Sequence, residues 1–447
     1  MKIVSRPAER HRYRLGALVA SASILVLAGC SSGGSTTQGS GGQETLSDQG
    51  PITIWSDATR MSGFKTYKKT HTDVDTRLVT YSATGKDLQT KVALFNQTGD
   101  GWPDAVQAQQ DDVTWATSDK FAFAQPLEKF IPQDVLDGFP AGSLAGCTVD
   151  GHLYCLKNDA TQSVLWYNQD LMDEFGYTVP TTWEEFTELG LRLAQEHPGY
   201  IVGSAGDGFV PRNYYAASQC PGQTLTDANT VHIDLDDPKC TRVTDMIDQL
   251  LAAGSMSRSG TFSPDFIKQY GGADSKLLMS FGPPWFPEYV FDDELKIPAG
   301  QMAAAMPPRW ADEPEAFTSD TGGSIYMVSS HSKNLKAAID AIVWMATDDG
   351  YQLTAPTMPA YGPEQVRWLK SINKDGYYSS DPSEVLVKAS SEIWPGWSNT
   401  LFDDEAIFSS TVLPRITAGD SIASAVDAWQ TELVNQARQL GYEVVDD

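Results

Sequence analysis

The stretch Trp166-Tyr-Asn-Gln-Asp-Leu-Met-Asp-Glu-Phe-Gly-Tyr-Thr-Val-Pro-Thr-Thr-Trp-Glu-Glu-Phe186 predicts two short helices joined by a turn. The first helix covers residues 168–175 and is closed by Gly176, because glycine readily adopts the left-handed conformation that ends a helix. The second helix begins after Thr182, since Thr182 and Glu185 have the spacing of a capping box. Three apolar residues then recur on one face of this helix: Phe186, Leu189 and Leu193. This face is expected to pack on a core.

Strands and amphipathic helices alternate on both sides of this stretch. Residues 51–55 predict a buried strand, residues 86–97 a helix and residues 103–108 the next strand, while later helices are predicted over 332–347 and 421–440. This alternation predicts an α/β protein with parallel sheets that are covered by helices on both faces. The chain beyond residue 50 has about four hundred residues, which exceeds the usual size of one hydrophobic core and predicts two lobes.

The first fifty residues have the layout of a signal peptide followed by a tether. A basic segment precedes an apolar run over residues 15–27, which is too short to span a bilayer as a stable helix. Leu27-Ala-Gly-Cys30 resembles the bacterial lipobox, which implies removal of residues 1–29 and a diacylglycerol on Cys30. Residues 30–50 are expected to form a flexible tether, because they have almost no apolar side chains. The expectation is a lipoprotein on the extracellular face of the cell membrane of a Gram-positive bacterium; the alternative is an ordinary signal peptide in which Cys30 is incidental.

The composition is strongly acidic. The chain has 58 acidic and 32 basic residues and a net charge of −26. Removal of residues 1–29 takes away five basic side chains and one acidic side chain, which leaves a net charge of −30. A body with this charge repels polyanions, so nucleic acid and anionic sugars are poor candidates for its ligand.

Four cysteines remain beyond the lipobox: Cys147, Cys155, Cys220 and Cys240. An even number of cysteines in an oxidising compartment indicates disulfides, and three pairings are possible. The sequence between Cys147 and Cys155 is typical of a hairpin with a three-residue loop, Asp150-Gly-His152, which favours this pair and leaves Cys220 with Cys240. A zinc site is disfavoured, because neither spacing is CxxC-like and no histidines cluster nearby. We therefore expect neither a metal nor a cofactor.

Several stretches together resemble one family, the extracellular solute-binding proteins of ABC transporters (family 1), and within it the carbohydrate-uptake branch similar to maltose-binding protein. The matching stretches are residues 87–95, 101–106, 149–154, 166–185, 322–338 and 436–442. They span essentially the whole body after the tether. The chain departs from the family where a proline usually follows the hairpin tyrosine, since Cys155-Leu156 stands there instead.

The resemblance implies an α/β, two-lobed periplasmic-binding-protein-like fold of the type II-like class with three hinge crossovers. The crossovers are expected near residues 156–164, 301–309 and 354–363. The N-terminal lobe would hold residues 51–158 and 309–358, and the C-terminal lobe residues 159–308 and 359–447. A ligand cleft would lie between the lobes and close when it is filled. The implied partners are an oligosaccharide and the subunits of an ABC permease.

A neutral sugar is bound by flat aromatic rings, which stack on its C–H faces, and by polar groups that bond its hydroxyls. The aromatic candidates are Trp285, in a proline-rich segment that cannot form a regular helix, and Trp394 and Trp397, which frame Pro395-Gly396. The polar candidates lie on loops after predicted strands or at the rim of the second lobe: Asp57, Gln109, Gln110, Asp111, Asp207 and Tyr214. Gly322 and Gly323 would let the backbone approach a hydroxyl closely. The alternatives are core packing for the tryptophans, solvated loop charges for the carboxylates and plain turns for the glycines.

The strongest competing function is that of a secreted glycoside hydrolase, which needs two carboxylates on either side of the bond it cleaves. No acidic residue of the chain lies in a hydrolase-like motif, and the sequence contains no GxSxG, HExxH, P-loop or GxGxxG pattern. A surface adhesin would more often show β-rich repeats. The sequence therefore predicts an oligosaccharide-binding lipoprotein without catalytic residues, with a non-sugar solute as the remaining alternative.

Overall fold

The computed structural model describes residues 48–83, 86–227, 229–355, 357–372, 376–394, 396 and 400–445. Met1–Thr45 and Leu46–Asp447 are two separate units, and the described residues belong to the second. The predicted signal peptide, the lipidation site Cys30 and Trp397 lie outside the described residues. Within the described part of the chain, no helix combines the length and the apolar character needed to cross a bilayer.

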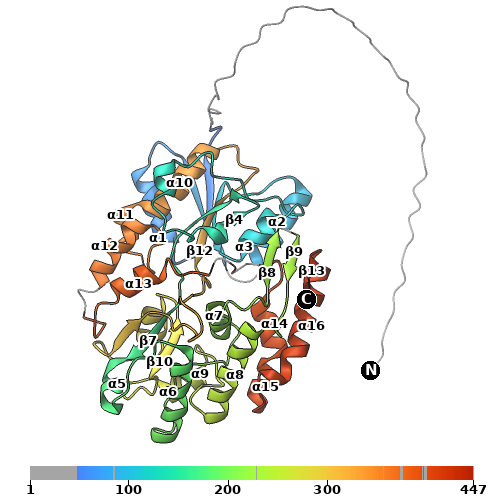
Figure 1. The fold of residues 1–447 in the computed structure, drawn as a ribbon. Helices are drawn as coiled ribbons and strands as arrows, with labels where there is room; N and C mark the ends of the chain where they lie inside the picture. The colour runs from blue at the N-terminus through green and yellow to red at the C-terminus, as the bar shows by residue number, and fades with distance from the viewer. Residues whose placement is uncertain are drawn as a thin grey trace, which may run out of the picture. The chain divides into compact units, whose positions relative to one another are not determined.

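A five-stranded sheet forms the centre of the first lobe (Figure 1). In spatial order its strands are β2 (Thr76–Thr80), β1 (Ile52–Ser56), β3 (Ala105–Gln109), β12 (Ser324–Val328) and β6 (Cys155–Lys157). β1 runs parallel to β2 and β3, whereas β12 runs antiparallel to β3 and β6. β12 follows a strand of the other lobe, so it starts at the edge where β1, β3 and β6 end. The expectation of a wholly parallel sheet is therefore wrong at this strand.

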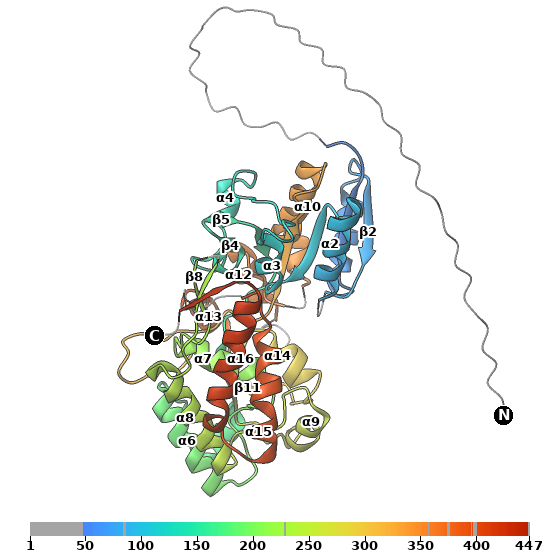
Figure 2. The same ribbon diagram turned by 90° about the vertical axis from the view of Figure 1, so that its right-hand side faces the viewer.

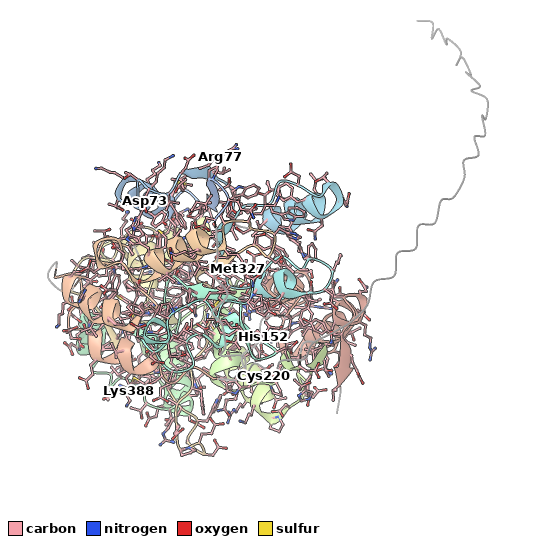
Figure 3. All side chains as sticks on the ribbon, turned by 90° about the horizontal axis from the view of Figure 1, so that it is seen from above. Asp73, Arg77, His152, Cys220, Met327 and Lys388 are labelled. Carbon is pink, nitrogen blue, oxygen red and sulfur yellow. A yellow bond between two sulfur atoms is a disulfide. The ribbon has the colours of Figure 1, made fainter. Side chains whose placement is uncertain are left out.

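Helices and a hydrophobic core surround the five-stranded sheet. The helices are α1 (Met61–Thr70), α2 (Asp87–Thr98), α3 (Asp112–Thr117), α4 (Gln133–Leu136), α10 (Leu335–Thr347) and α11 (Asp349–Gln352). α10 packs on α1 and on four strands of the sheet, and α2 packs on α3. In the view from above (Figure 3), Asp73 and Arg77 lie at the periphery and Met327 lies further inward. Arg77 belongs to the edge strand β2, where a charged side chain discourages pairing with another chain.

A three-stranded sheet forms the centre of the second lobe. Its strands are β10 (Met279–Gly282), β7 (Val164–Asn168) and β11 (Met302–Ala305), in this spatial order. Both pairings are antiparallel, so the expected parallel sheet is wrong here as well. β10 and β11 lie on either side of β7, and both run in the direction opposite to it. Parallel neighbours would need a crossover connection that returns the chain to the same end of the sheet.

Ten α-helices, a π-helix over Pro287–Asp292 and a small sheet lie around this centre in the described residues of the second lobe. The helices are α5 (Gln169–Phe175), α6 (Trp183–Glu196), α7 (Phe209–Ala217), α8 (Pro238–Ala253), α9 (Pro264–Tyr270), α12 (Gly362–Ile372), α13 (Ser383–Ala389), α14 (Asp404–Thr411), α15 (Leu413–Ala418) and α16 (Val426–Gln439). The small sheet consists of β13 (Glu443–Val445), β9 (Thr230–His232) and β8 (Thr224–Asp227). Figure 2 shows α14, α15 and α16 side by side on one flank of this lobe.

The two helices predicted from the opening stretch are confirmed. The side chain of Asn168 accepts a hydrogen bond from Leu171 N at the start of α5, and Gly176 ends the helix in the left-handed conformation. At α6, Thr182 and Glu185 form the predicted capping box in both directions. The last helix is only partly as predicted. A 3₁₀ turn at Ala423–Ala425 separates its expected start from α16, because the Asp248 carboxylate caps the preceding backbone amides.

Both cysteine pairs form disulfides, Cys147–Cys155 and Cys220–Cys240. The hairpin beside the first consists of β4 (Thr148–Val149) and β5 (His152–Leu153). Its loop has two residues, Asp150 and Gly151, and not three, because Val149 pairs with His152. Both loop residues have positive φ angles of 50° and 78°, as a tight type I′ turn requires.

Three segments connect the lobes: residues 158–163 between β6 and β7, 306–323 between β11 and β12, and 353–361 between α11 and α12. They are joined by short bridges, Asp159 with Pro359 and Gln162 with Asp320. The second segment still pairs with the second lobe at Thr318, whose amide donates to Glu392 O at 2.9 Å. The chain therefore enters the first lobe between residues 318 and 324, later than the expected 301–309.

Candidate ligand-binding site

A cavity of about 460 Å³ lies between the two lobes. The first lobe and the first two crossovers contribute residues that lie at or after the ends of β1, β3 and β6 or directly before β12: Thr59, Arg60, Gln109, Gln110, Asp111, Asp159, Gly322 and Gly323. The second lobe and the third crossover contribute Phe209, Phe262, Trp285, Tyr289, Thr357 and Glu405. β1 leads to β2 on one side while β3 lies on its other side, so the cavity lies at a switch point at the carboxyl ends of the strands, where open α/β sheets bind ligands.

Aromatic rings form the wall on the side of the second lobe. The half-buried Trp285 stacks with Phe262, their ring centroids 6.3 Å apart and their planes at 20°. Phe209 and Tyr289 lie 5.6 Å and 6.3 Å from the same indole. Phe262 is 51% exposed, so its ring is available to a partner. Behind the wall, the fully buried Phe286 packs on Trp285 at 4.9 Å and anchors it to the core.

Asp207 positions this wall without lining the cavity. Its Oδ1 accepts hydrogen bonds from the amides of Phe209 and Val210, and its Oδ2 accepts one from Thr261 N. These bonds fix the two segments that carry Phe209 and Phe262. The side chain expected at the rim of the second lobe therefore holds the aromatic residues in place.

Tyr214 does not lie at a rim. Its side chain is 1% exposed and packs among the rings of Trp183, Phe186 and Phe281 in the core of the second lobe. Burial raises the pKa of this phenol above its ordinary value, and the side chain lies on a buried face of α7. The prediction of Tyr214 as a rim residue is corrected to core packing.

Arg60 supplies the only cationic side chain that lines this cavity in the described residues. Asp57 holds it in two ways: Asp57 Oδ1 accepts from Arg60 N at 2.7 Å, and Oδ2 pairs with Nη1 at 3.0 Å. Asp159, which is nearly fully buried, lies 3.7 Å from Nη2. Burial alone would lower the pKa of Arg60, but Asp159 and Asp57 raise it above its ordinary value. Asp57 thus acts through Arg60 and is not itself part of the lining.

Gln109, the last residue of β3, and the two residues that follow it, Gln110 and Asp111, come together at the cavity. Gln110 is 1% exposed, and its Nε2 donates to the carbonyl and to the carboxylate of Asp320. This anchor ties the loop after β3 to the second crossover. Gln109 and Asp111 are more exposed and are better placed to meet a ligand hydroxyl.

Gly322 and Gly323 also reach the cavity, with φ angles of 79° and 85°. A Cβ on Gly323 would lie 2.5 Å from the Thr161 side chain, whereas a Cβ on Gly322 would lie 3.4 Å from the ring of Phe209. The chain therefore needs glycine here both for its backbone conformation and for close packing at residue 323.

Trp394 lines neither the cavity between the lobes nor the cavity of about 210 Å³ that adjoins it. It is half-buried, and its amide donates to Thr318 O at 3.0 Å beside the second crossover. The structure thus brings eight of the eleven predicted residues to one place or to its immediate support, and leaves Tyr214 and Trp394 apart from it. Those at the cavity are Gln109, Gln110, Asp111, Trp285, Gly322 and Gly323, while Asp57 lies behind Arg60 and Asp207 holds the aromatic wall.

Several lining residues were missed by the sequence analysis: Arg60, Asp159, Phe209, Phe262, Tyr289 and Glu405. For Arg60 and Asp159 a signal existed, because each follows a strand that ends at the same sheet edge. Phe209 and Phe262 carried no local signal. They meet Trp285 only through tertiary contacts across more than seventy and twenty positions, respectively.

A second cavity of about 210 Å³ adjoins the first and shares Gln109, Asp111 and Glu405 with it. It is rich in acidic groups and also contains Lys86 and Arg212. Burial raises the pKa of Glu405 to about 7, with Arg212 opposing this shift and neighbouring carboxylates adding to it. In the described residues no group of three or more His, Cys, Asp and Glu side chains is arranged to hold a metal ion.

The model of the family described as bacterial extracellular solute-binding protein matches residues 55–352, about two thirds of the chain. The chain belongs to this family. Its members act outside the cytoplasm, and the family is one of binding proteins.

Solved structures of solute-binding proteins share this two-lobed fold. One is the ABC transporter-associated binding protein of Bifidobacterium animalis subsp. lactis Bl-04 in complex with β-1,6-galactobiose, with 20% identity, a TM-score of 0.69 and coverage of 89% of this chain and 99% of that one. Another is the galacto-N-biose-/lacto-N-biose I-binding protein of Bifidobacterium longum in complex with lacto-N-biose, with 18% identity, a TM-score of 0.72 and coverage of 89% and 100%. The cyclic α-maltosyl-1,6-maltose-binding protein of Arthrobacter globiformis has 19% identity, a TM-score of 0.67 and coverage of 87% and 99%. At these identities the likeness establishes the fold.

A curated relative is the "Probable ABC transporter-binding protein" of Deinococcus radiodurans, 25% identical over 240 residues. The match covers 49% of this chain and spans about half, 53%, of the length of that relative.

Proposed function

We propose that this solute-binding protein captures a neutral oligosaccharide between its lobes and delivers it to the permease of an ABC importer. One observation carries the proposal. A cavity between the lobes has an aromatic wall around Trp285 on one side and hydrogen-bonding residues after β1 and β3 on the other. Its volume of about 460 Å³ lies within the usual range of small-molecule sites.

The chemistry of the two walls suits a sugar. The nearly parallel rings of Trp285 and Phe262 offer flat apolar faces to the C–H side of a pyranose. Gln109, Asp111 and Arg60 offer acceptors and donors to its hydroxyls. Arg60 is balanced by Asp57 and Asp159, so it can donate to a hydroxyl without presenting an uncompensated positive charge that would favour an anion.

The relatives support the same ligand class. Structures with this fold were solved with β-1,6-galactobiose and with lacto-N-biose. Because identity to them is low, the monosaccharide type and the linkage do not carry over to this chain. We carry over only the ligand class as a proposal: a short saccharide that is held between the two lobes.

We place the lobes by their separate hydrophobic cores. The first lobe comprises residues 51–158 and about 321–358, and the second comprises 159–318 and 359–445. Two buried apolar clusters support this division, one around the five-stranded sheet and one around the three-stranded sheet. Closure of these lobes on the sugar would create the form that a permease recognises, through the extra contacts that the ligand makes in the closed state.

The protein is proposed to leave its ligand chemically unchanged and to use no cofactor. It is also proposed to be a lipoprotein, exported by the signal peptide of residues 1–29 and held at the extracellular face of the cell membrane by a lipid on Cys30. The lipobox-like sequence and the family's location outside the cytoplasm support this position.

Calorimetric titration with a panel of neutral di- to hexasaccharides tests the proposal, with the sugar recovered afterwards and analysed by mass spectrometry. Saturable binding of one sugar per protein with the sugar recovered intact is the expected result. Recovery of shorter sugars would support the glycoside hydrolase instead. Absence of binding across the panel, together with binding of an amino acid, peptide or ion, would assign a non-sugar solute to the cleft.

A further inference from the structure

Arg212 on α7 holds a buried guanidinium at the junction of the two lobes. Its side chain is 6% exposed and is surrounded by three carboxylates. Nε lies 3.0 Å from Asp404 Oδ2, and Nη1 lies 3.4 Å from Glu405 Oε1 and 3.8 Å from Asp111 Oδ2. Burial alone would lower the pKa of Arg212, but these carboxylates together raise it, so the guanidinium stays charged.

The three carboxylates come from different lobes. Asp404 and Glu405 begin α14 of the second lobe, which is also the lobe of Arg212. Asp111 follows β3 of the first lobe and is 56% exposed. Of the three contacts, therefore, only the one between Arg212 and Asp111 crosses from one lobe to the other.

We propose that Arg212 is a lobe-coupling residue, which forms an ion pair with Asp111 when the lobes approach and loses it when they separate. Asp404, whose side chain is 17% exposed, keeps the guanidinium in place from within the same lobe. Rotation of the lobes would leave the Arg212–Asp404 pair intact and break the Arg212–Asp111 pair. The closed arrangement thereby gains an attraction that is present without any ligand.

This coupling is separate from capture of the solute. Asp111 and Glu405 also line the cavity beside Trp285, so Arg212 positions one carboxylate from each lobe at the same wall. The other charged groups of the adjoining cavity are Lys86, Asp112 and Asp403. A measurement on the ligand-free protein isolates the contribution of the ion pair to the balance between closed and open molecules. No sugar is present there, so a contact between Asp111 and a sugar cannot affect the result.

The test measures the distance between the lobes in the ligand-free full chain by single-molecule energy transfer. Dyes are attached through non-natural amino acids at two exposed positions, Lys69 on α1 of the first lobe and Gln249 on α8 of the second. The variant is Asp111→Asn. Because this side chain is exposed, the substitution is expected to leave the folded structure intact. The matched control is Asp119→Asn. Asp119 is an exposed residue of the same lobe, and its carboxylate lines neither cavity.

Asp111→Asn is expected to lower the ratio of closed to open molecules by about two- to fivefold, the range of a pair with one exposed partner. High salt is expected to shift the wild type in the same direction and to leave Asp111→Asn nearly unchanged. Arg212→Lys retains the positive charge beside Asp404. In this background, Asp111→Asn should change the ratio of closed to open molecules only slightly. An unchanged distance distribution in Asp111→Asn, or an equal shift in Asp119→Asn, would overturn the proposal while leaving sugar capture untouched.

Discussion

Trp285 illustrates how one side chain serves both packing and binding. Its indole packs against the buried Phe286 on one side and contacts Phe262 and Phe209 at the cavity on the other. The preceding Pro283-Pro284 prevents a regular helix, and the π-helix that starts at Pro287 then carries Tyr289 to the same wall. Such short π-helices are often found at functional sites.

Substitution Trp285→Ala is expected to weaken sugar affinity at least tenfold, about 1.4 kcal/mol, because it removes the centre of the stacking surface. The melting temperature should fall by only a few degrees, since the indole is half-buried. Calorimetry and thermal unfolding measure the two effects. The matched control is Trp102→Ala, a half-buried tryptophan that stacks on His331 outside the cavity and should leave affinity unchanged. A large loss of stability with intact affinity would assign Trp285 to the core alone.

Glu405 is expected to make stability depend on pH. Burial raises its pKa to about 7 from the ordinary value of 4.5, so between these values the folded protein binds more protons at this residue than the unfolded chain does. The free energy of unfolding should therefore fall as pH rises through this window. With a side chain that is 39% exposed, solvent screens the charges and the effect should be no more than about 1 kcal/mol.

Chemical denaturation at about pH 5 and about pH 8 compares the wild type with Glu405→Gln. The variant is expected to lose this part of the pH dependence. Identical slopes in the two proteins would show that the carboxylate titrates normally in the folded state.

At the scale of elements, the capping box of α6 fixes where this helix starts against the second crossover. The Thr182 hydroxyl accepts from Glu185 N at 3.1 Å, and Thr182 itself bridges to Arg309. Thr182→Ala should lower the free energy of unfolding by about 1 kcal/mol. Thr187→Ala in the same helix is the control and should be nearly neutral, because alanine is a better helix former. Equal losses in the two variants, measured in urea, would speak against the cap as the cause.

The turn before β12 gives a second prediction at this scale. Gly323→Ala combines an unfavourable positive φ with a contact of 2.5 Å to Thr161. Gly322→Ala also has an unfavourable positive φ, but its Cβ would make an ordinary van der Waals contact of 3.4 Å with Phe209. Gly323→Ala should therefore be the more destabilising of the two by about 1–3 kcal/mol in denaturant unfolding. If both variants lost the same amount, close packing at residue 323 would not be the reason for its glycine.

Local chemistry explains which elements could be predicted. Asn168, Gly176, Thr182 and Glu185 act within a few residues of their partners, and the structure confirms their caps. The direction of a strand could not be predicted from neighbouring residues in the same way. The direction of β12 depends on where the chain crosses between lobes, and that crossing lies near residue 320.

The same distinction applies to the site. Gln109, Gln110 and Asp111 were predictable as residues directly after a buried strand, and the structure places them at the cavity. Tyr214 was misplaced because helix α7 is buried on nearly all sides, so its sequence pattern does not show which residues face a rim. Phe209 and Phe262 depended on the fold of the second lobe, where Asp207 holds their two segments together.

At the scale of the whole molecule, two hydrophobic cores meet along three polar crossovers and leave a cavity between them. The buried ion pair between Lys157, the last residue of β6, and Asp320 ties the second crossover to the first lobe, and the sheet of each lobe has a core of its own. Capture of a ligand between lobes needs this arrangement, because a ligand held by both lobes favours the closed form over the open one.

The most direct test is the crystal structure of the protein with the tightest-binding saccharide of the panel. We predict an intact sugar between the lobes, one ring stacked on Trp285, and its hydroxyls bonded by residues of the loops after β1 and β3. Density for the sugar outside this cavity, or for a hydrolysed product within it, would contradict the account.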